Sequence, residues 1–322
     1  MLIAELCQNH NGDRNLLERM ISEAAKSGAT HCKIQHIYSS NLTFRPEFET
    51  GLITNEGTMC IKRPYQDEFN RLKSLELSDE DCKRFIEMCK DFNLIPMTTC
   101  FTRNYVEKIK EIGFEVVKIA SYDCSSFQLL REIANKFDHI VVSTGATFDN
   151  EIEKAAEILN NKKFTFLHCV TKYPTNLEDL NLARINWLKQ FTNNVGFSDH
   201  SLRSKNGPLA SMAAIAKGAD SIECHFTVLN ADQTKDGAVS TNPKQFEEIA
   251  QFIKLSKGDQ IQYLNNKISN WDEITEGKAK RLLSHEELLN RAYYKGRFAS
   301  PRKNSKNGKN MIFNWEEVSL DK

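Results

Sequence analysis

Short apolar segments rich in β-branched residues recur along the chain and alternate with longer segments whose apolar residues are spaced three and four positions apart. The first pattern is typical of buried strands and the second of amphipathic helices. The strand-like segments read "LIAELCQ", "THCKIQHIY", "LIPMTTC", "EVVKIAS", "HIVVSTG", "FTFLHCV", "NVGFSDH" and "SIECHFT". Near-continuously apolar strands that alternate with helices predict a parallel α/β architecture. With eight such strands, we expect a closed (β/α)₈ TIM barrel.

Several of the helical segments begin with Ser, Asp or Asn and end in Gly or Asn, as helix caps do. One interval departs from the alternation, because residues 39–77 are too many for a turn and one helix. We expect these residues to form an ordered excursion over one face of the barrel. After a last helix within residues 242–258, the chain from about residue 265 loses the strand and helix rhythm. This tail is expected to be a partly mobile surface appendage.

The 322 residues include 43 basic and 43 acidic side chains, so their charges cancel. This balance gives no electrostatic attraction to nucleic acid or anionic lipid, and it favours a small-molecule ligand. The apolar stretch at the N-terminus is short and contains Glu5, and no long uncharged apolar segment follows. We therefore expect a cytoplasmic protein without a membrane span. The nine cysteines show no C-x-x-C spacing, and we interpret them as reduced thiols, mostly small core residues.

Polar residues gather where the predicted strands end, and in a TIM barrel those ends form the active-site face. A single lysine there usually reaches solvent, and a single Ser or Thr usually caps the next helix. Two lysines and several hydroxyls on one rim predict a site for a phosphorylated or carboxylated substrate. The strand-end residues are Glu5, Asn9, His10, Lys33, Gln35, Thr98, Thr99, Lys118, Ser121, Ser143, Thr144, Gly145, Thr171, Tyr173, Ser198, Asp199, His200, Glu223 and His225.

Two of the eight histidines end neighbouring strands. His200 and His225 can point at one spot beside Asp199 and Glu223, which suits a divalent transition metal. Either histidine alone would more often be a satisfied rim residue. His168 is interpreted as structural, and His10 is ambiguous between a site and a turn.

The motifs at these strand ends resemble, in order, those of the sialic acid synthase (NeuB-like) family. The resemblance covers about residues 3–243. The matching segments are "AELCQNHNGD", "CKIQ", "TTCF", "KIAS", "STG", "LHCVTKYPT", "GFSDHS", "ECHFT" and "KDGAVSTNP". In two places the chain departs from the family pattern: "TTCF" lacks the usual proline, and "SYDC" stands where Gly and Glu are common.

The resemblance implies a role for each matching position. His200 and His225 would bind Mn²⁺, with Mg²⁺ or Co²⁺ as substitutes, and Glu5 would lie beside the reacting carbons. Gln35 and Asp236 would meet the hydroxyls of an amino sugar. The residues expected to clamp phosphoenolpyruvate are Lys33, Thr99, Lys118, Ser121, Ser143, Tyr173 and Ser198.

The implied reaction joins phosphoenolpyruvate to an open-chain amino sugar, N-acetylmannosamine or a di-N-acetylated relative. It yields a nonulosonic acid and releases phosphate by cleavage of a C–O bond. Two alternatives stay open. One is a synthase that condenses phosphoenolpyruvate with a sugar phosphate. The other is a relative that binds phosphoenolpyruvate and metal without turnover.

Family members also carry a C-terminal antifreeze-like domain, whose arginine contacts the sugar in the partner subunit. The segment "YYKGRFASPRKNSKNGKNMIFNWEEV" resembles the start of that domain, but Arg297 and Arg302 do not match the position of its arginine. We therefore expect a barrel domain over residues 1–264. A linker with a truncated antifreeze-like segment is expected over residues 265–322, and the family's dimer makes a homodimer an expectation here.

Overall fold

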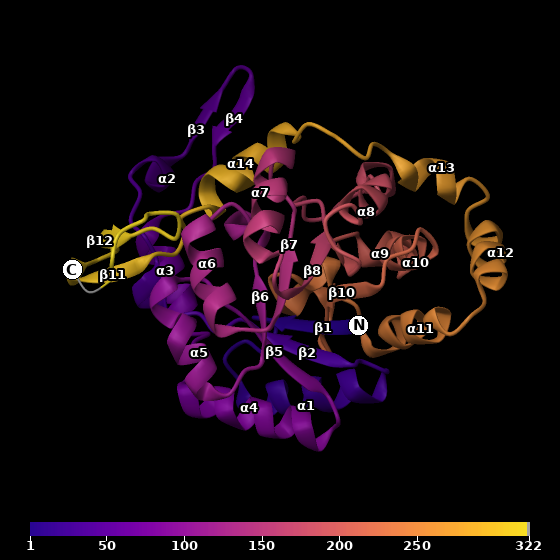
Figure 1. Cartoon of the computed structure of the whole chain (residues 1–322), viewed down its shortest axis with the longest axis horizontal. Helices are drawn as coiled ribbons and strands as arrows, with labels where there is room; N and C mark the ends of the chain where they lie inside the picture. Colours follow the sequence, from indigo (N-terminus) through magenta and orange to yellow (C-terminus); the bar gives the residue numbers. More distant parts are fainter. Residues whose placement is uncertain (321–322) are drawn as a thin grey trace.

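Eight parallel strands close into a barrel in the computed structural model, which describes residues 1–320. Their order around the barrel is β1-β10-β9-β8-β7-β6-β5-β2 (Figure 1). The strands are β1 (Leu2–Cys7), β2 (His31–Ile34), β5 (Ile95–Thr99), β6 (Val116–Ile119), β7 (His139–Ser143), β8 (Lys163–His168), β9 (Val195–Asp199) and β10 (Ser221–His225). Each coincides with one of the eight apolar segments, and only β8 extends beyond its segment, by Lys163, so the predicted TIM barrel is confirmed.

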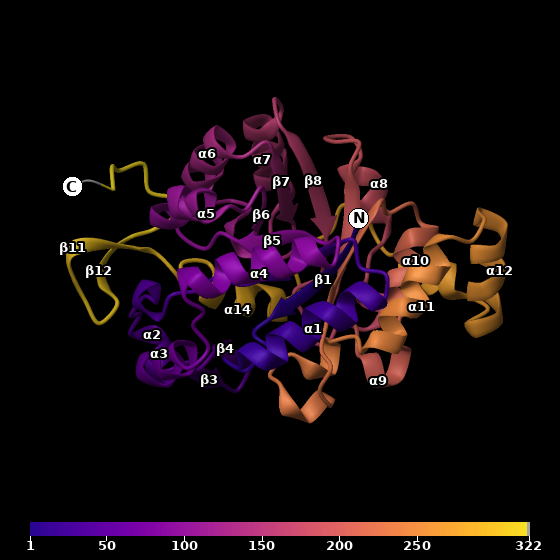
Figure 2. The same cartoon turned by 90° about the horizontal axis from the view of Figure 1, so that it is seen from below.

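An outer layer of helices surrounds the strands (Figures 1 and 2). These are α1 (Arg14–Lys26), α4 (Asp79–Asp91), α5 (Val106–Ile112), α6 (Phe127–Lys136), α7 (Asp149–Leu159), α8 (Ala183–Leu188), the pair α9 (Arg203–Asn206) and α10 (Leu209–Ala216), and α11 (Pro243–Ile253). Side-chain caps fix several of the starts. Asp13 accepts two backbone hydrogen bonds at α1, and Ser78 and Asp81 form a reciprocal capping box at α4.

Two apolar clusters hold the barrel together. The larger one lies between strands and helices and includes Phe85, Phe114 and Phe246. The smaller one plugs the barrel interior with Ile3, Met97, Val116, Val141 and Leu167. Because side chains alternate along a strand, the residue two positions after each plug residue also faces the interior, one layer nearer the C-terminal mouth. This alternation positions the polar layer described below.

The excursion between β2 and β5 is ordered, as predicted. It holds α2 (Glu47–Thr50), a hairpin of β3 (Leu52–Thr54) and β4 (Gly57–Cys60), and α3 (Tyr65–Lys73). Leu42 in this excursion forms a β-bridge with Phe298 of the tail. The excursion and the tail are therefore packed against each other at the mouth of the barrel.

The tail is packed against the barrel, contrary to the expected surface appendage, since Tyr293, Ala299 and Ile312 are buried. It consists of α12 (Lys257–Lys267), α13 (Trp271–Glu276), α14 (His285–Tyr294), β11 (Ser300–Lys306) and β12 (Lys309–Ile312). The expected boundary after residue 264 falls inside α12. Figure 1 shows the chain running from α12 past α13 to α14.

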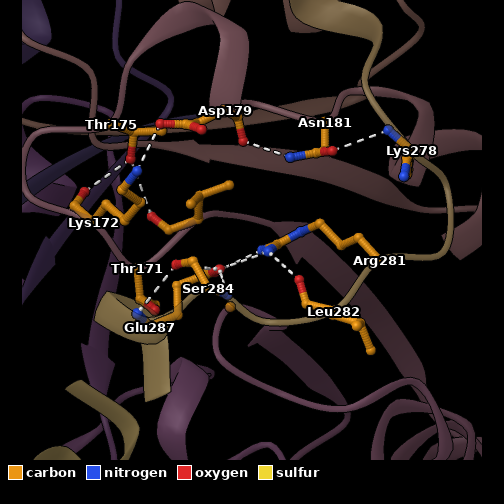
Figure 3. Close-up of polar contacts among 12 residues, drawn as sticks. Thr171, Lys172, Thr175, Asp179, Asn181, Lys278, Arg281, Leu282, Ser284 and Glu287 are labelled. Atoms are coloured by element: carbon orange, nitrogen blue, oxygen red, sulfur yellow. Dashed lines mark hydrogen bonds and ion pairs between the residues drawn. The ribbon is translucent and has the colours of Figure 1, made fainter. Parts of the chain in front are cut away.

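Hydrogen bonds tie the segment before α14 to the loop that follows β8 (Figure 3). Asn181 accepts a hydrogen bond at 2.9 Å from the backbone N–H of Lys278. Arg281 forms two hydrogen bonds of 2.6 Å with the Glu287 carboxylate, which also closes the cap at Ser284. A charge-assisted pair of this kind is strong and directional. The first bond ties the tail to the barrel, and the others order the start of α14, whose Asn290 donates a hydrogen bond of 2.8 Å to the Thr171 carbonyl oxygen after β8.

Within residues 1–320, no helix combines the length and apolar character needed to cross a bilayer. All nine cysteines are free thiols, and only Cys60 is not fully buried.

Candidate active site

The family resemblance assigned roles to twelve residues, and all twelve line one pocket of about 370 Å³ at the C-terminal mouth of the barrel. The alternation of side chains explains why. Two positions beyond the plug residues Ile3, Met97, Val116 and Val141 stand Glu5, Thr99, Lys118 and Ser143. The other predicted residues in the pocket are Lys33, Gln35, Ser121, Tyr173, Ser198, His200, His225 and Asp236. The structure thus brings the predicted set together, and the role of each residue stays a prediction.

Two buried ion pairs form one side of this pocket. Lys118 Nζ lies 2.7 Å from Glu223 Oε1, and Lys33 Nζ contacts Glu5 Oε2. Lys33 also lies 3.5 Å from Glu223 Oε2. All four side chains are at most 5% exposed, so their charges interact with little screening by water. These four residues are called the ion-paired side.

Burial and neighbouring charges shift the pKa values on the ion-paired side. Burial, together with the charge of Lys118, lowers the pKa of Lys33 to about 7, even though Glu223 acts to raise it. For Glu223 burial acts to raise the pKa, but Lys118 and Lys33 outweigh it and hold the pKa well below its usual range. Glu223 is therefore an anion near neutral pH, while Lys33 stands close to its titration point.

Hydroxyl groups flank these charges. Ser198 donates a hydrogen bond of 2.8 Å to Glu223, and Lys33 donates one of 3.3 Å to Thr99. Ser143 Oγ is buried and has no hydrogen-bond partner among the described residues. An unpaired buried hydroxyl costs about 1 to 3 kcal/mol unless a ligand satisfies it. Ser143 thus offers a hydrogen bond to an anion held by the lysines.

Gly145, just after β7, allows close packing of the chain behind the pocket residue Ser121. A Cβ atom built on Gly145 would lie 2.6 Å from Cys169 Sγ and 3.0 Å from Ser121 Oγ. The first distance is too short for any real contact. The "STG" segment therefore needs glycine at this position to keep Ser121 where it is.

Two imidazoles form the opposite side of the pocket. The ring centroids of His200 and His225 are 5.5 Å apart. His200 Nδ1 lies 3.1 Å from the carbonyl oxygen of Val170, and Nε2 lies 3.3 Å from the Tyr173 hydroxyl. If Nδ1 carries the proton and donates to that carbonyl, the Nε2 lone pair faces the pocket.

Burial keeps both rings neutral at ordinary pH. It lowers the pKa of His200 to about 4, with the neighbouring His225 adding to the effect, and it lowers the pKa of His225 as well. Neutral imidazoles are the form that binds metal ions.

The donor set near His225 fits a metal ion. His225 Nδ1 is buried without a hydrogen-bond partner among the described residues, and it lies 3.7 Å from Asp236 Oδ2. The ligand atoms of Cys7, His225 and Asp236 all lie within 4.8 Å of one another. We call Cys7, His200, His225 and Asp236 the imidazole side.

Two carboxylates are not where the sequence suggested, beside the histidine pair. Asp199 faces the helix layer, where it accepts hydrogen bonds from Arg203 at 2.9 Å and from Ser211 at 2.5 Å. Its position between Ser198 and His200 explains this, because consecutive residues of a strand point in opposite directions. Glu223 faces the interior but binds Lys118 and Lys33. His168 Nε2 lies 2.7 Å from the Leu180 carbonyl oxygen, in keeping with a structural role.

The outer wall of the pocket was missed at the sequence level. It is cationic and contains Arg63 and Arg71 from the excursion, Lys235 from the loop after β10 and Arg297 from the tail. Arg71 pairs with Glu68 through two hydrogen bonds of 2.9 Å, and Arg297 contacts the same carboxylate. Among the described residues, Arg63 and Lys235 have no ion pair within 4 Å. No local pattern predicts this wall, because its residues are far apart in the chain.

Comparisons with known proteins agree on one family. The NeuB family model matches residues 20–260. An N,N'-diacetyllegionaminic acid synthase from Campylobacter jejuni is 31% identical over 268 residues, which are 79% of this chain and 75% of that protein. A pseudaminic acid synthase from Campylobacter jejuni is 29% identical over 321 residues, which are 98% of this chain and 85% of that protein.

A solved structure supports the same conclusion. The N-acetylneuraminic acid synthetase of Leptospira borgpetersenii, solved with citrate, has 30% sequence identity and a TM-score of 0.67, and the match covers 90% of each chain. Since the family model spans most of the barrel and the identities extend over it, the chain belongs to the NeuB family.

Proposed function

We propose that this protein is a metal-dependent synthase that condenses phosphoenolpyruvate with an open-chain amino sugar. The product would be a nonulosonic acid, with phosphate released. The acceptor would be N-acetylmannosamine or a related di-N-acetylated hexose. One observation carries the proposal: a single pocket presents two buried lysines and several hydroxyl groups on one side and two neutral imidazoles on the other.

The ion-paired side would bind phosphoenolpyruvate. In the structure, Glu5 and Glu223 hold the lysine ammonium groups inside the pocket and so reduce the cost of burying them. An arriving phosphate or carboxylate would share those cations and accept hydrogen bonds from Ser121, Ser143 and Ser198. Thr99 would orient Lys33, and Tyr173 would cover the bound molecule from the loop after β8.

The imidazole side would bind the aldehyde end of the acceptor. A divalent ion such as Mn²⁺, held by His200 and His225, would supply Lewis-acid polarisation of the aldehyde oxygen. Gln35 and Asp236 line the same pocket and would accept or donate hydrogen bonds to the sugar hydroxyls. The two reactants would then face each other across the pocket, which converts their encounter into an intramolecular step.

The proposed reaction forms a C–C bond and a C–O bond to water, and it breaks the C–O bond to phosphate. The methylene carbon of phosphoenolpyruvate attacks the aldehyde carbon, and water adds to the cationic carbon that results. Glu5, in contact with Lys33, would take a proton from that water, and the former aldehyde oxygen would take up a proton to become a hydroxyl. The tetrahedral carbon then expels phosphate, whose charge Lys33 and Lys118 stabilise. No covalent nucleophile is needed.

Phosphate release tests the proposal. Purified protein is mixed with phosphoenolpyruvate, Mn²⁺ and each of a panel of amino sugars, including N-acetylmannosamine and diacetamido-trideoxyhexoses. We expect at least one acceptor to raise phosphate release above the rate without sugar. If none does, the proposed reaction is wrong. Calorimetric binding of phosphoenolpyruvate and Mn²⁺ without turnover would instead favour the non-catalytic alternative.

A phosphorylated acceptor is a second candidate, and the cationic outer wall favours it. Partial desolvation in the pocket, with the charge of Arg71, lowers the pKa of Lys235 to about 8, while Glu68 partly opposes this shift. An anionic partner, such as a sugar phosphate, would stabilise the charged form of Lys235. Arabinose 5-phosphate, erythrose 4-phosphate and the 6-phosphate of the best amino sugar belong in the same panel. A preference for one of them would move the assignment to sugar phosphates.

A further inference from the structure

Cys7 has an uncommon backbone conformation for its residue type. Its φ of 42° lies in the left-handed region, where five of the other six non-glycine residues with positive φ are asparagine. The pairing of β1 with β2 shifts register between Glu5 and Cys7, so the strand bulges there. A side chain in this conformation costs about 1 to 2 kcal/mol. Bulges of this kind often direct a side chain toward an active site.

The conformation places the Cys7 side chain with the imidazole side rather than in the core. Six other cysteines pack in the large cluster between strands and helices. Cys7 is fully buried but is not part of that cluster. Its Sγ instead lies within 4.8 Å of ligand atoms of both His225 and Asp236. Among the described residues, these three alone form such a group.

The arrangement around His225 points to a ligand. The residue is 8% exposed, and Nδ1 has no hydrogen-bond partner among the described residues. A buried imidazole nitrogen of this kind is usually paired, because leaving it unpaired costs free energy. Sulfur, nitrogen and carboxylate oxygen at such separations suit one ion bound at 2.0 to 2.3 Å. The Nε2 atom of His200 faces the same pocket from the neighbouring strand β9.

We propose that Cys7 Sγ, His225 Nδ1 and one oxygen of Asp236 form a mixed sulfur, nitrogen and oxygen site for a borderline divalent ion, with His200, which lies outside this group, as the further ligand that the proposed function assigns. The inference rests on the proposed function for the location of the ion. It adds Cys7 and Asp236 as ligands, and it names the class of ion. Thiolate ligands favour Zn²⁺ or Co²⁺, whereas Mn²⁺ and Mg²⁺ prefer oxygen.

This ligand set changes what the chain's own residues do. Binding of the ion releases the Cys7 proton to solvent, and the thiolate then offsets one of the two positive charges. Asp236 has two carboxylate oxygens, so one can bind the ion while the other meets a sugar hydroxyl. His200 keeps its orientation through the Val170 carbonyl.

Cobalt spectroscopy tests the site without any substrate. The apoprotein is titrated with Co²⁺, and absorption is recorded in the visible and near ultraviolet. Thiolate bound to Co²⁺ gives a near-ultraviolet charge-transfer band, whereas nitrogen and oxygen ligands give only the visible bands. We expect both kinds of band to saturate together at one equivalent.

Two variants remove the thiol. Cys7→Gly also removes the side chain that the left-handed backbone disfavours, so this variant should fold at least as well as the parent. Cys7→Ser keeps the size of the side chain. We expect both to lose the charge-transfer band and to bind Zn²⁺ on the order of a hundredfold more weakly, with a smaller change for Mn²⁺. Cys60→Ser, at the half-buried thiol of the β4 hairpin, is the matched control and should keep the band.

Each outcome decides the proposal. A parent protein that binds Co²⁺ without the charge-transfer band, or a band that persists in Cys7→Gly and Cys7→Ser, overturns it. A band lost in both variants and kept in Cys60→Ser supports it. Because no acceptor is present, this result is independent of the phosphate-release assay. Failure of that assay would reject the proposed reaction and leave the metal site standing.

Discussion

The two sides of the barrel mouth hold their polar groups in opposite ways. On the ion-paired side, each buried charge faces an opposite charge within 3.5 Å. On the imidazole side, the rings are neutral and His225 Nδ1 lacks a partner among the described residues. The first side is electrostatically complete by itself. The second becomes complete only with a further group, and this difference distinguishes the proposed anion site from the proposed metal site.

Removing an imidazole should have the largest effect. For His200→Ala we expect metal-dependent phosphate release to fall by about a hundredfold or more, since metal polarisation of a carbonyl contributes several kcal/mol. The fold should remain, because the ring lies in the pocket at the barrel mouth, apart from the two apolar clusters that hold the barrel together. Initial rates over a Mn²⁺ titration measure the effect. His139→Ala, at the opposite end of the barrel, is the control and should behave as the parent. Unchanged rates in His200→Ala would remove the distinction between the two sides.

Breaking an ion pair should come next. Lys118→Met leaves Lys33 as the single cation beside the buried Glu223 carboxylate. It also removes a charge-assisted contact to phosphoenolpyruvate that is worth about 1.5 to 3 kcal/mol. We expect weaker phosphoenolpyruvate binding by calorimetry and a lower thermal unfolding temperature. Lys136→Met breaks the exposed pair with Glu107, also short at 2.6 Å, and should change stability by about 0 to 1 kcal/mol. Equal effects of the two substitutions would contradict the importance of burial.

The pH dependence of binding should separate the two lysines. Because the pKa of Lys33 is lowered to about 7, its charge is lost as the pH rises through 7, well below its ordinary value of 10.5. Phosphoenolpyruvate affinity should therefore fall above pH 7, by up to about tenfold per pH unit. Calorimetry across that range measures it, and Lys33→Met should flatten the profile. A parent profile that is already flat would show that Lys33 does not contact the anion.

The same lowered pKa predicts a trend in stability. A lysine that loses its proton more readily when folded destabilises the fold most below pH 7, and this cost is relieved as the pH rises from 7 toward 10.5. Between pH 7 and 10.5, the parent should therefore gain stability relative to Lys33→Met. Thermal unfolding of both proteins across the window measures the shift.

A hydroxyl deletion should have the smallest effect. Ser143→Ala removes a buried hydroxyl that has no partner among the described residues, so stability should stay the same or rise slightly. Phosphoenolpyruvate binding should weaken by about 1 kcal/mol, near fivefold, if Ser143 donates to it. Calorimetry and thermal unfolding together measure both effects. A loss of stability without a loss of affinity would assign Ser143 to the fold instead.

The barrel and the location of the site were predictable because strand and helix periods are local. The alternation that places Glu5 above Ile3 and Lys118 above Val116 is a property of each strand alone. It also shows that Asp199, between two inward residues, must face outward. Counting positions along β9 would have revealed this from the sequence.

Contacts between distant segments were beyond sequence reasoning. Glu223 and Lys118 are 105 residues apart, and Arg297 meets Glu68 across 229 residues. Which acid pairs with which base depends on the closed geometry of the barrel and on where the tail packs. The role of Cys7 was hidden for another reason, because a thiol in an apolar run is indistinguishable from a core residue until its φ and neighbours are known.

Gly145 sets a limit on any redesign of acceptor preference. Even one added methyl group at that position would collide with Cys169 and Thr171 and push on Ser121. The exposed side chains of Arg63 and Lys235 on the outer wall have no such constraint. Libraries that vary the outer wall should therefore yield many folded variants, whereas libraries that vary Gly145 should yield few.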